Sequence, residues 1–259
     1  MTPKKIILLV KVFDKEEYAD SFIQTGEMFC KTIGQFKQIE GDVARGDQFE
    51  APSDWHQPDR ISLTFSFKTP DGEEKSFPIE GLAGPLVIQR TAHDRLNAFC
   101  MYAVTVPDFE ESYETEEERL RVVEKINSML KVHATLGEEM LSLGEHAVLI
   151  IKVADFIDKV SKAAKSEGYT SSRGLVDYFD PETFHGSFGE VESVFKKRSI
   201  YSYQKEFRFV FDSSKPEGAK TLYAGPLDGI AFKLKTSEIN SKIELKLAED
   251  QHGDGDSLG

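Results

Sequence analysis

Cysteine is scarce in this chain, which has two cysteines, Cys30 and Cys100, among its 259 residues. Both lie among apolar neighbours, and two thiols in a chain of this length do not build a disulfide framework. We therefore expect two buried, reduced cysteines and a cytoplasmic protein.

Long apolar runs are also missing. The apolar segment near the start, residues 6–13, is interrupted by Lys11 and followed by Asp14, and no small-residue cleavage site comes after it. This pattern predicts a β-strand rather than a signal peptide. No stretch approaches the roughly 20 apolar residues that a membrane-spanning helix needs, so we expect no membrane segment.

Positive charge is in deficit, with 45 acidic residues against 32 Lys and Arg and a formal net charge of −13. Because proteins bind nucleic-acid phosphates largely by releasing counterions with Lys and Arg, direct nucleic-acid binding is not expected. The acidic stretch from Asp108 to Glu118 precedes an amphipathic helix and has two interpretations. It is either a solvated helix start or a docking surface for a basic protein partner.

The signatures of common cofactor and metal sites are absent as well. The chain has no P-loop, no G-x-G-x-x-G, no G-x-S-x-G, no H-E-x-x-H and no C-x-x-C. Its six histidines lack the spacing of metal ligands; they are His56, His93, His133, His146, His185 and His252. We expect no metal site and no bound cofactor.

The apolar pattern that is present predicts an α+β fold. Segments with strand and helix periodicity follow one another without regular βαβ alternation. We expect a single domain over residues 1–248, built on a mostly antiparallel mixed sheet with two or three flanking helices. A hairpin is predicted around the T-P-D-G turn at residues 69–72. Residues 166–190 read as a loop-rich insert, and the acidic tail, residues 249–259, is expected to be disordered.

The sharpest pattern is the stretch from Tyr201 to Asp212, Y-S-Y-Q-K-E-F-R-F-V-F-D. Aromatic and polar residues alternate with a period of two, which predicts one half-buried β-strand. The aromatic rings would face the core. The opposite face would carry a polar row, formed by Gln204, Glu206 and Arg208.

Three short motifs give this chain a resemblance to a known family. They are R-G-D-Q-F-E at Arg45–Glu50, A-F-C-M-Y at Ala98–Tyr102 and Y-Q-K-E-F-R at Tyr203–Arg208. Their order resembles an uncharacterised family of bacterial and prophage domains, whose members tend to have G/N-D-P-x-E, C-F-S and Y-E-K-E-W-R motifs. Met and Tyr follow Cys100 here, where Phe and Ser follow in the family. The resemblance implies an intracellular α+β domain and a role in phage–host conflict, because some members occur among phage-defence genes.

A second resemblance concerns chemistry. The triplet Gln204-x-Glu206 is similar to the E/Q-x-E signature that ADP-ribosyltransferases carry on a late strand. It implies NAD as substrate, with Glu206 stabilising an oxocarbenium-like transition state and Gln204 orienting the acceptor. Arg208, Arg95 or Arg90 would meet the pyrophosphate. The family's other two signatures are missing, and the structural alternative is a set of cross-strand pairs.

Three further segments offer candidate site residues. His93 and Arg95 begin a strand predicted at residues 96–106, and they would complete a site with Glu206 if the two strands pair; otherwise they form a polar turn. Tyr178 and His185, in the 166–190 insert, are candidates for substrate binding because long loops carry function disproportionately. The polar loop at residues 40–59 is either a substrate lid or an ordinary turn.

Two functional hypotheses follow. The first in order of preference is an intracellular phage-defence or phage–host conflict protein that binds a host or phage protein through its acidic surface. The alternative is an ADP-ribosyltransferase-like enzyme that uses NAD, with Glu206 as its key acid. Missing transferase signatures favour the partner-binding hypothesis.

Overall fold

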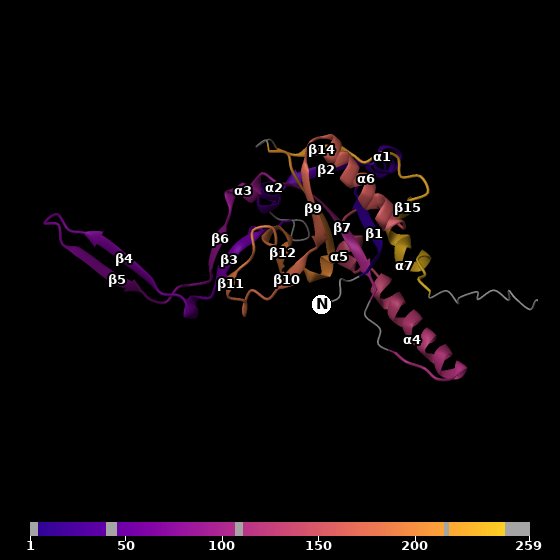
Figure 1. Cartoon of the computed structure of the whole chain (residues 1–259), viewed down its shortest axis with the longest axis horizontal. Coiled ribbons are helices and arrows are strands. Elements are labelled where there is room, and N and C mark those ends of the chain that lie inside the picture. Colours follow the sequence, from indigo (N-terminus) through magenta and orange to yellow (C-terminus); the bar gives the residue numbers. More distant parts are fainter. Residues whose placement is uncertain (1–4, 40–45, 107–110, 215–217, 247–259) are drawn as a thin grey trace, which may run out of the picture.

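The computed structural model describes residues 5–39, 46–106, 111–214 and 218–246, and its fold is α+β, as predicted (Figure 1). Arg45, Asp108, Glu110 and the predicted tail at 249–259 lie outside the described residues. The structure contains one large antiparallel sheet, three smaller sheets and several flanking helices.

The large sheet has the strand order β14-β2-β7-β1-β8-β15, and β13 pairs with both β7 and β9. Its strand pairs are all antiparallel, which confirms the predicted sheet type. The strands are β1 (Ile6–Phe13), β2 (Glu27–Thr32), β7 (Asn97–Thr105), β8 (His146–Ile150), β9 (Thr170–Leu175), β13 (Glu206–Asp212), β14 (Lys220–Tyr223) and β15 (Ala231–Lys235).

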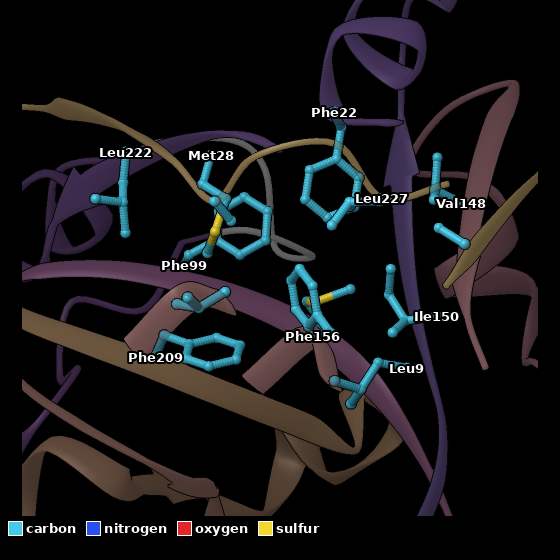
Figure 2. Packing of buried hydrophobic residues seen from close by; sticks show 14 of the residues in the cluster. Leu9, Phe22, Met28, Phe99, Val148, Ile150, Phe156, Phe209, Leu222 and Leu227 are labelled. Carbon is cyan, nitrogen blue, oxygen red and sulfur yellow. The ribbon is translucent and has the colours of Figure 1, made fainter. Parts of the chain in front are cut away.

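One face of this sheet packs against helices α1 (Glu16–Thr25) and α6 (Val153–Ser166). Phe22 from α1 and Phe156 from α6 meet edge to face, with ring centroids 5.9 Å apart, and Phe99 of β7 completes the aromatic centre (Figure 2). Edge-to-face rings are favourable beyond the apolar area that they bury. This cluster is the main hydrophobic core.

The opposite face carries two smaller apolar clusters. One lies under the end of α4 (Glu116–Ala134) and under α5 (Glu138–Leu141) and α7 (Ile239–Lys242). The other lies under α2 (Ile33–Lys37) and contains Ile33, Ala98 and Val210. Between the two clusters, this face of β13 carries Glu206 and Arg208, whose register partners are Tyr102 and Cys100 of β7. The functional candidates therefore lie inside the protein, between two apolar clusters.

The strand predicted at Tyr201–Asp212 is shorter than expected. Ser199–Gln204 forms a 3₁₀ helix, and Lys205 closes it in the left-handed region at φ 38° by donating its N–H to Ser202 O. The strand β13 begins only at Glu206 and pairs with β7 on one edge and β9 on the other. Both of its faces are buried, since its phenylalanines pack in the main core and Val210 packs in the cluster under α2. Gln204 is thus not on this strand, and the prediction that one strand carries Gln204, Glu206 and Arg208 in a single row was wrong.

The 166–190 insert is also more ordered than predicted. It contains β9, β10 (Asp177–Phe179) and β11 (Gly186–Ser187), and β10 pairs in parallel with β12 (Lys196–Arg198). Strand β9 reads T-S-S-R-G-L, which has few strand-forming side chains. An edge strand tolerates such residues because its outer side faces solvent.

A long hairpin extends away from the body, to the left in Figure 1. Strands β4 (Leu63–Lys68) and β5 (Glu74–Ile79) pair only with each other, and Gly72, at φ 89°, closes the turn between them. This confirms the predicted hairpin. At its base, β3 (Pro52–His56) pairs with β6 (Leu86–Gln89) and β11, and the short helix α3 (Thr91–Asp94) follows.

Candidate functional site

Four charged side chains from three separate segments meet beneath the sheet. We call them the buried quartet; they are Glu50, Lys197, Glu206 and Arg208. Their side chains are 2%, 5%, 6% and 2% exposed. Two of the resemblance motifs supply Glu50, Glu206 and Arg208, and Cys100 of the third motif lies opposite Arg208 in the strand register.

The quartet is cross-linked by charge-assisted contacts. Arg208 Nε donates to Glu206 Oε1 at 2.6 Å, and its Nη2 lies 2.9 Å from Glu50 Oε1. Lys197 Nζ lies 3.3 Å from Glu50 Oε2 and 3.4 Å from Glu206 Oε2, and it donates to Gln204 Oε1 at 2.8 Å. Two carboxylates and two cations therefore balance one another in a place where an isolated charge would be very costly.

The segment before β3 positions Glu50. Asp47 Oδ1 accepts the Phe49 N–H at 3.0 Å, and the Glu50 N–H donates to Asp47 O at 2.9 Å, so the chain makes a tight turn. Arg198 ties this turn down by donating to Asp47 Oδ1 at 2.6 Å. Ala51 then takes φ 54°, a left-handed conformation that is costly for a residue with a side chain. Asp47 and Glu50 of this turn are buried, whereas Gln48 is exposed. The contacts of Asp47 favour the interpretation of this segment as an ordinary turn over a lid.

The electrostatics of the quartet keep Glu206 and Lys197 ionised. Burial alone would raise the pKa of Glu206, but the charges of Arg208 and Lys197 outweigh it and hold that pKa well below its ordinary range. Burial alone would lower the pKa of Lys197, but the carboxylates of Glu50 and Glu206 raise it above its ordinary value. Burial, reinforced by the charge of Glu206, raises the pKa of Cys100, so this thiol stays protonated and unreactive.

A pocket of about 580 Å³ reaches the quartet where the sheet divides. Strand β1 pairs with residues 102–105 of β7, and β2 pairs only with residues 97–98. The two strands therefore diverge and leave residues 99–101 of β7 between them. The Lys11 side chain donates Nζ–H to the backbone Cys100 O at 2.8 Å, a hydrogen bond that a neighbouring strand would otherwise supply.

The pocket combines apolar walls with charges of both signs. Its lining includes Phe29, Phe36 and Ile39 together with Lys11 and Lys31, and it also includes all four members of the quartet. No histidine is among the described residues that line it.

The structure brings several predicted site residues together. Glu206, Arg208 and Gln204 converge on the pocket, although Gln204 reaches it from the 3₁₀ helix rather than from the strand. Tyr178 does not line the pocket but contacts this group, because its hydroxyl accepts the Glu206 backbone N–H at 3.0 Å. Burial raises the pKa of Tyr178, and the nearby charge of Glu206 adds to this effect.

His93 and Arg95 do not join the site. They precede Asn97, which pairs with Phe211 at the opposite end of β13 from Glu206. Five residues of strand correspond to roughly 17 Å. His93 is buried against Ser193 Oγ, 3.2 Å from its Nδ1, and Arg95 is exposed. The two strands do pair, but their register places His93 and Arg95 away from Glu206, so these residues do not complete a site with it.

Two other predicted site residues make their contacts away from the pocket. Arg90 forms an exposed ion pair with Glu190 at 2.9 Å. His185 lies just before β11, where its Nδ1 accepts the Gln57 N–H at 3.1 Å and its ring packs on His56 with centroids 5.1 Å apart.

Sequence reasoning missed Lys197, which joins both carboxylates. It stands in a K-K-R triplet whose neighbours, Lys196 and Arg198, are more exposed and form their own ion pairs. No local pattern distinguishes the buried lysine of such a triplet from an exposed one.

No protein-family model, curated protein or solved structure matches this chain. Within the described ranges, no three His, Cys, Asp or Glu side chains are grouped so that they could hold a metal ion. The helices of the same ranges include none with the length and apolar character of a membrane span.

Proposed function

We propose that this protein is an enzyme that binds a nucleotide in the pocket and cleaves the nicotinamide–ribose bond of NAD. The observation that carries this proposal is the position of two buried carboxylates, Glu50 and Glu206, on the lining of a pocket of about 580 Å³. Small-molecule sites typically enclose about 300–1,000 Å³ and combine apolar walls with a few fixed polar groups. The pocket has both properties.

The lining suits a ligand with a ring, a sugar and phosphates. Phe29 and Phe36 offer aromatic surface for a ring, and Lys31 offers a cation for phosphate oxygens. Carboxylates accept hydrogen bonds from sugar hydroxyls, and Glu50 Oε1 is buried with no hydrogen-bond partner among the described residues, although Arg208 lies close to it.

The ionised state of Glu206 suits this reaction. In NAD the bond between ribose C1′ and the pyridinium nitrogen breaks, and its electron pair leaves with neutral nicotinamide. The positive charge that develops at C1′ is stabilised by an ionised carboxylate. Water, or an acceptor nucleophile, forms the new bond to C1′ and releases one proton to solvent. Because the leaving group needs no proton, a pocket without a histidine meets the requirement.

Roles within this site follow from the contacts. Glu206 is the group that would face the developing positive charge, and Arg208 and Lys197 fix its orientation and keep it ionised. Gln204 accepts a hydrogen bond from Lys197, which fixes its side chain. Gln204 would orient the acceptor from its position at the end of the 3₁₀ helix. Tyr178 holds the backbone at Glu206.

The partner-binding hypothesis has weaker support at its predicted surface. Within α4, Glu116 pairs with Arg119 and Glu117 pairs with Arg121. Glu118 accepts the Thr115 N–H in a capping box. These contacts pair much of the negative charge at the start of α4 with groups of the same helix, so less of that charge is available to bind a basic partner. A role in phage–host conflict remains a proposal supported by the motif resemblance alone.

Titration calorimetry with NAD, ADP-ribose and nicotinamide tests the proposal, together with chromatography of the products formed from NAD. We expect NAD to bind and nicotinamide to appear in step with ADP-ribose or an ADP-ribosylated acceptor. Lys31→Ala should weaken binding of NAD and ADP-ribose but not of nicotinamide. Glu190→Gln, outside the pocket, is the matched control. Absence of both NAD binding and nicotinamide release would contradict the proposal.

A further inference from the structure

The β4–β5 hairpin, which we call the arm, is a two-stranded sheet that projects from the body (Figure 1). Its strands have no other partner in the described chain. An isolated two-stranded hairpin is at best marginally stable in water, so a projecting arm normally needs a surface to pack on.

One face of the arm is apolar. The register pairs Leu63 with Ile79, Phe65 with Phe77, and Phe67 with Lys75, and side chains directly opposite one another share a face. The resulting strip has an aliphatic row at the base, a double-phenylalanine row in the middle and one more ring, beside Lys75, toward the tip.

The opposite face of the arm is polar. Ser66 and Ser76 hydrogen-bond to each other across it at 2.6 Å, and Thr64 faces Pro78. The arm is therefore amphipathic in the manner of a strand pair that covers something with one face only.

The apolar strip is exposed. Phe65, Phe67, Phe77 and Ile79 are 55%, 41%, 52% and 46% exposed. Single exposed apolar residues are ordinary, but contiguous ones mark an interaction surface.

We propose that the arm is a dimerisation element, and that the apolar strips of two copies of this chain pack face to face across a two-fold axis. A two-fold interface uses the same patch on both copies, and a strip of this kind is its own complement. Stacked antiparallel about the middle row, Phe67 of each copy covers Leu63 and Ile79 of the other, while the four rings of the two middle rows meet at the centre.

The available area sets how strongly two copies can pair. A buried phenylalanine accounts for about 150–250 Å², so four residues that are each about half exposed offer on the order of 400 Å² per copy. Two copies thus bury roughly 800 Å², below the smallest stable standard interfaces of about 1,200 Å² and in the range of weak, transient contacts. This area predicts a weak dimer that depends on concentration.

The edges of the arm favour stacking over strand addition. Pro78 leaves β5 one backbone donor short, and charged Lys68, Glu74 and Lys75 lie toward the tip. Proline and charge are devices that keep an edge strand from pairing with another chain. The faces of the arm are therefore its means of association.

Sedimentation velocity of the full chain, from sub-micromolar to tens of micromolar, tests the proposal. We expect the wild type to shift from monomer to dimer across this range. The double variant Phe65→Thr/Phe77→Thr, which keeps strand-forming residues, should stay monomeric throughout. Ser66→Thr/Ser76→Thr alters the polar face of the same two rows and should dimerise like the wild type.

A second measurement distinguishes loss of the interface from unfolding of the arm. A single cysteine at Phe77→Cys should form a disulfide between copies under mild oxidation, whereas Ser76→Cys, on the other face, should not. A wild type that is monomeric at every concentration would overturn the proposal. So would a dimer that the double threonine variant leaves intact, or a monomer whose arm instead captures an unrelated protein.

Discussion

The buried quartet and the arm both depart from the usual placement of side chains, in which charges face solvent and aromatic rings lie in the core. Around the quartet, four charges are enclosed between apolar clusters. On the arm, three phenylalanine rings stand in solvent. Neither arrangement is the one that stability alone would select, since buried ion pairs often stabilise less than apolar residues of similar volume. The two proposals give each place a reason: a small ligand that the quartet would contact, and a second chain that the arm would contact.

The largest effect is expected at the centre of the quartet. Arg208→Ala leaves Glu206 and Glu50 buried with Lys197 as their remaining cation, and breaking a buried ion network in this way costs about 3–5 kcal/mol. Urea unfolding followed by circular dichroism measures it. Arg121→Ala removes an exposed pair with Glu117 and should change stability by less than about 0.5 kcal/mol. Equal losses in the two variants would contradict the account of the quartet.

The same residue type should behave differently in the core and on the arm. Phe22→Ala opens a cavity in the main core (Figure 2) and should cost about 3–5 kcal/mol. Phe77→Ala should cost no more than about 0.5 kcal/mol in a dilute, monomeric sample, because its ring is half exposed. If Phe77→Ala destabilised the monomer as much as Phe22→Ala, the arm would be packed rather than exposed.

A smaller effect is expected from acid. The pKa of Glu206 is below its ordinary value of 4.5 in the folded chain, so the unfolded chain binds a proton that the folded chain does not. The stability from this carboxylate is complete above that ordinary value and is lost as the pH falls toward the folded pKa. The free energy of unfolding should therefore decline below about pH 5, and less steeply in Glu206→Gln. Parallel declines in both proteins would count against a paired Glu206.

Much of the fold could be predicted from the sequence because it depends on local patterns. The T-P-D-G turn between two alternating segments specified the arm hairpin, and apolar spacing specified α4 and its N-terminal acids. The pattern failed at Tyr201–Gln204, where burial follows the three-residue period of a 3₁₀ helix and Tyr201 and Gln204 are the buried residues. It also failed at β9, where pairing with β13 rather than local propensity makes the strand.

The candidate site was only partly predictable. Glu206 and Arg208 stood out because they lie two residues apart in an aromatic strand. Their partners Glu50 and Lys197 come from distant segments, and no local feature reveals which charges will be buried together. His93 was misplaced because the antiparallel register with β13, rather than the order along the chain, decides which end of β7 lies beside Glu206.

The most direct test of the central claim compares nicotinamide release from NAD by the wild type, by Glu206→Gln and by the control Glu190→Gln, each checked for folding by circular dichroism. The account predicts turnover by the wild type and the control, and a loss of about 10²- to 10³-fold in Glu206→Gln, the range seen when one transition-state-stabilising group is removed. Release by Glu206→Gln at the wild-type rate, or by none of the three proteins, would contradict it.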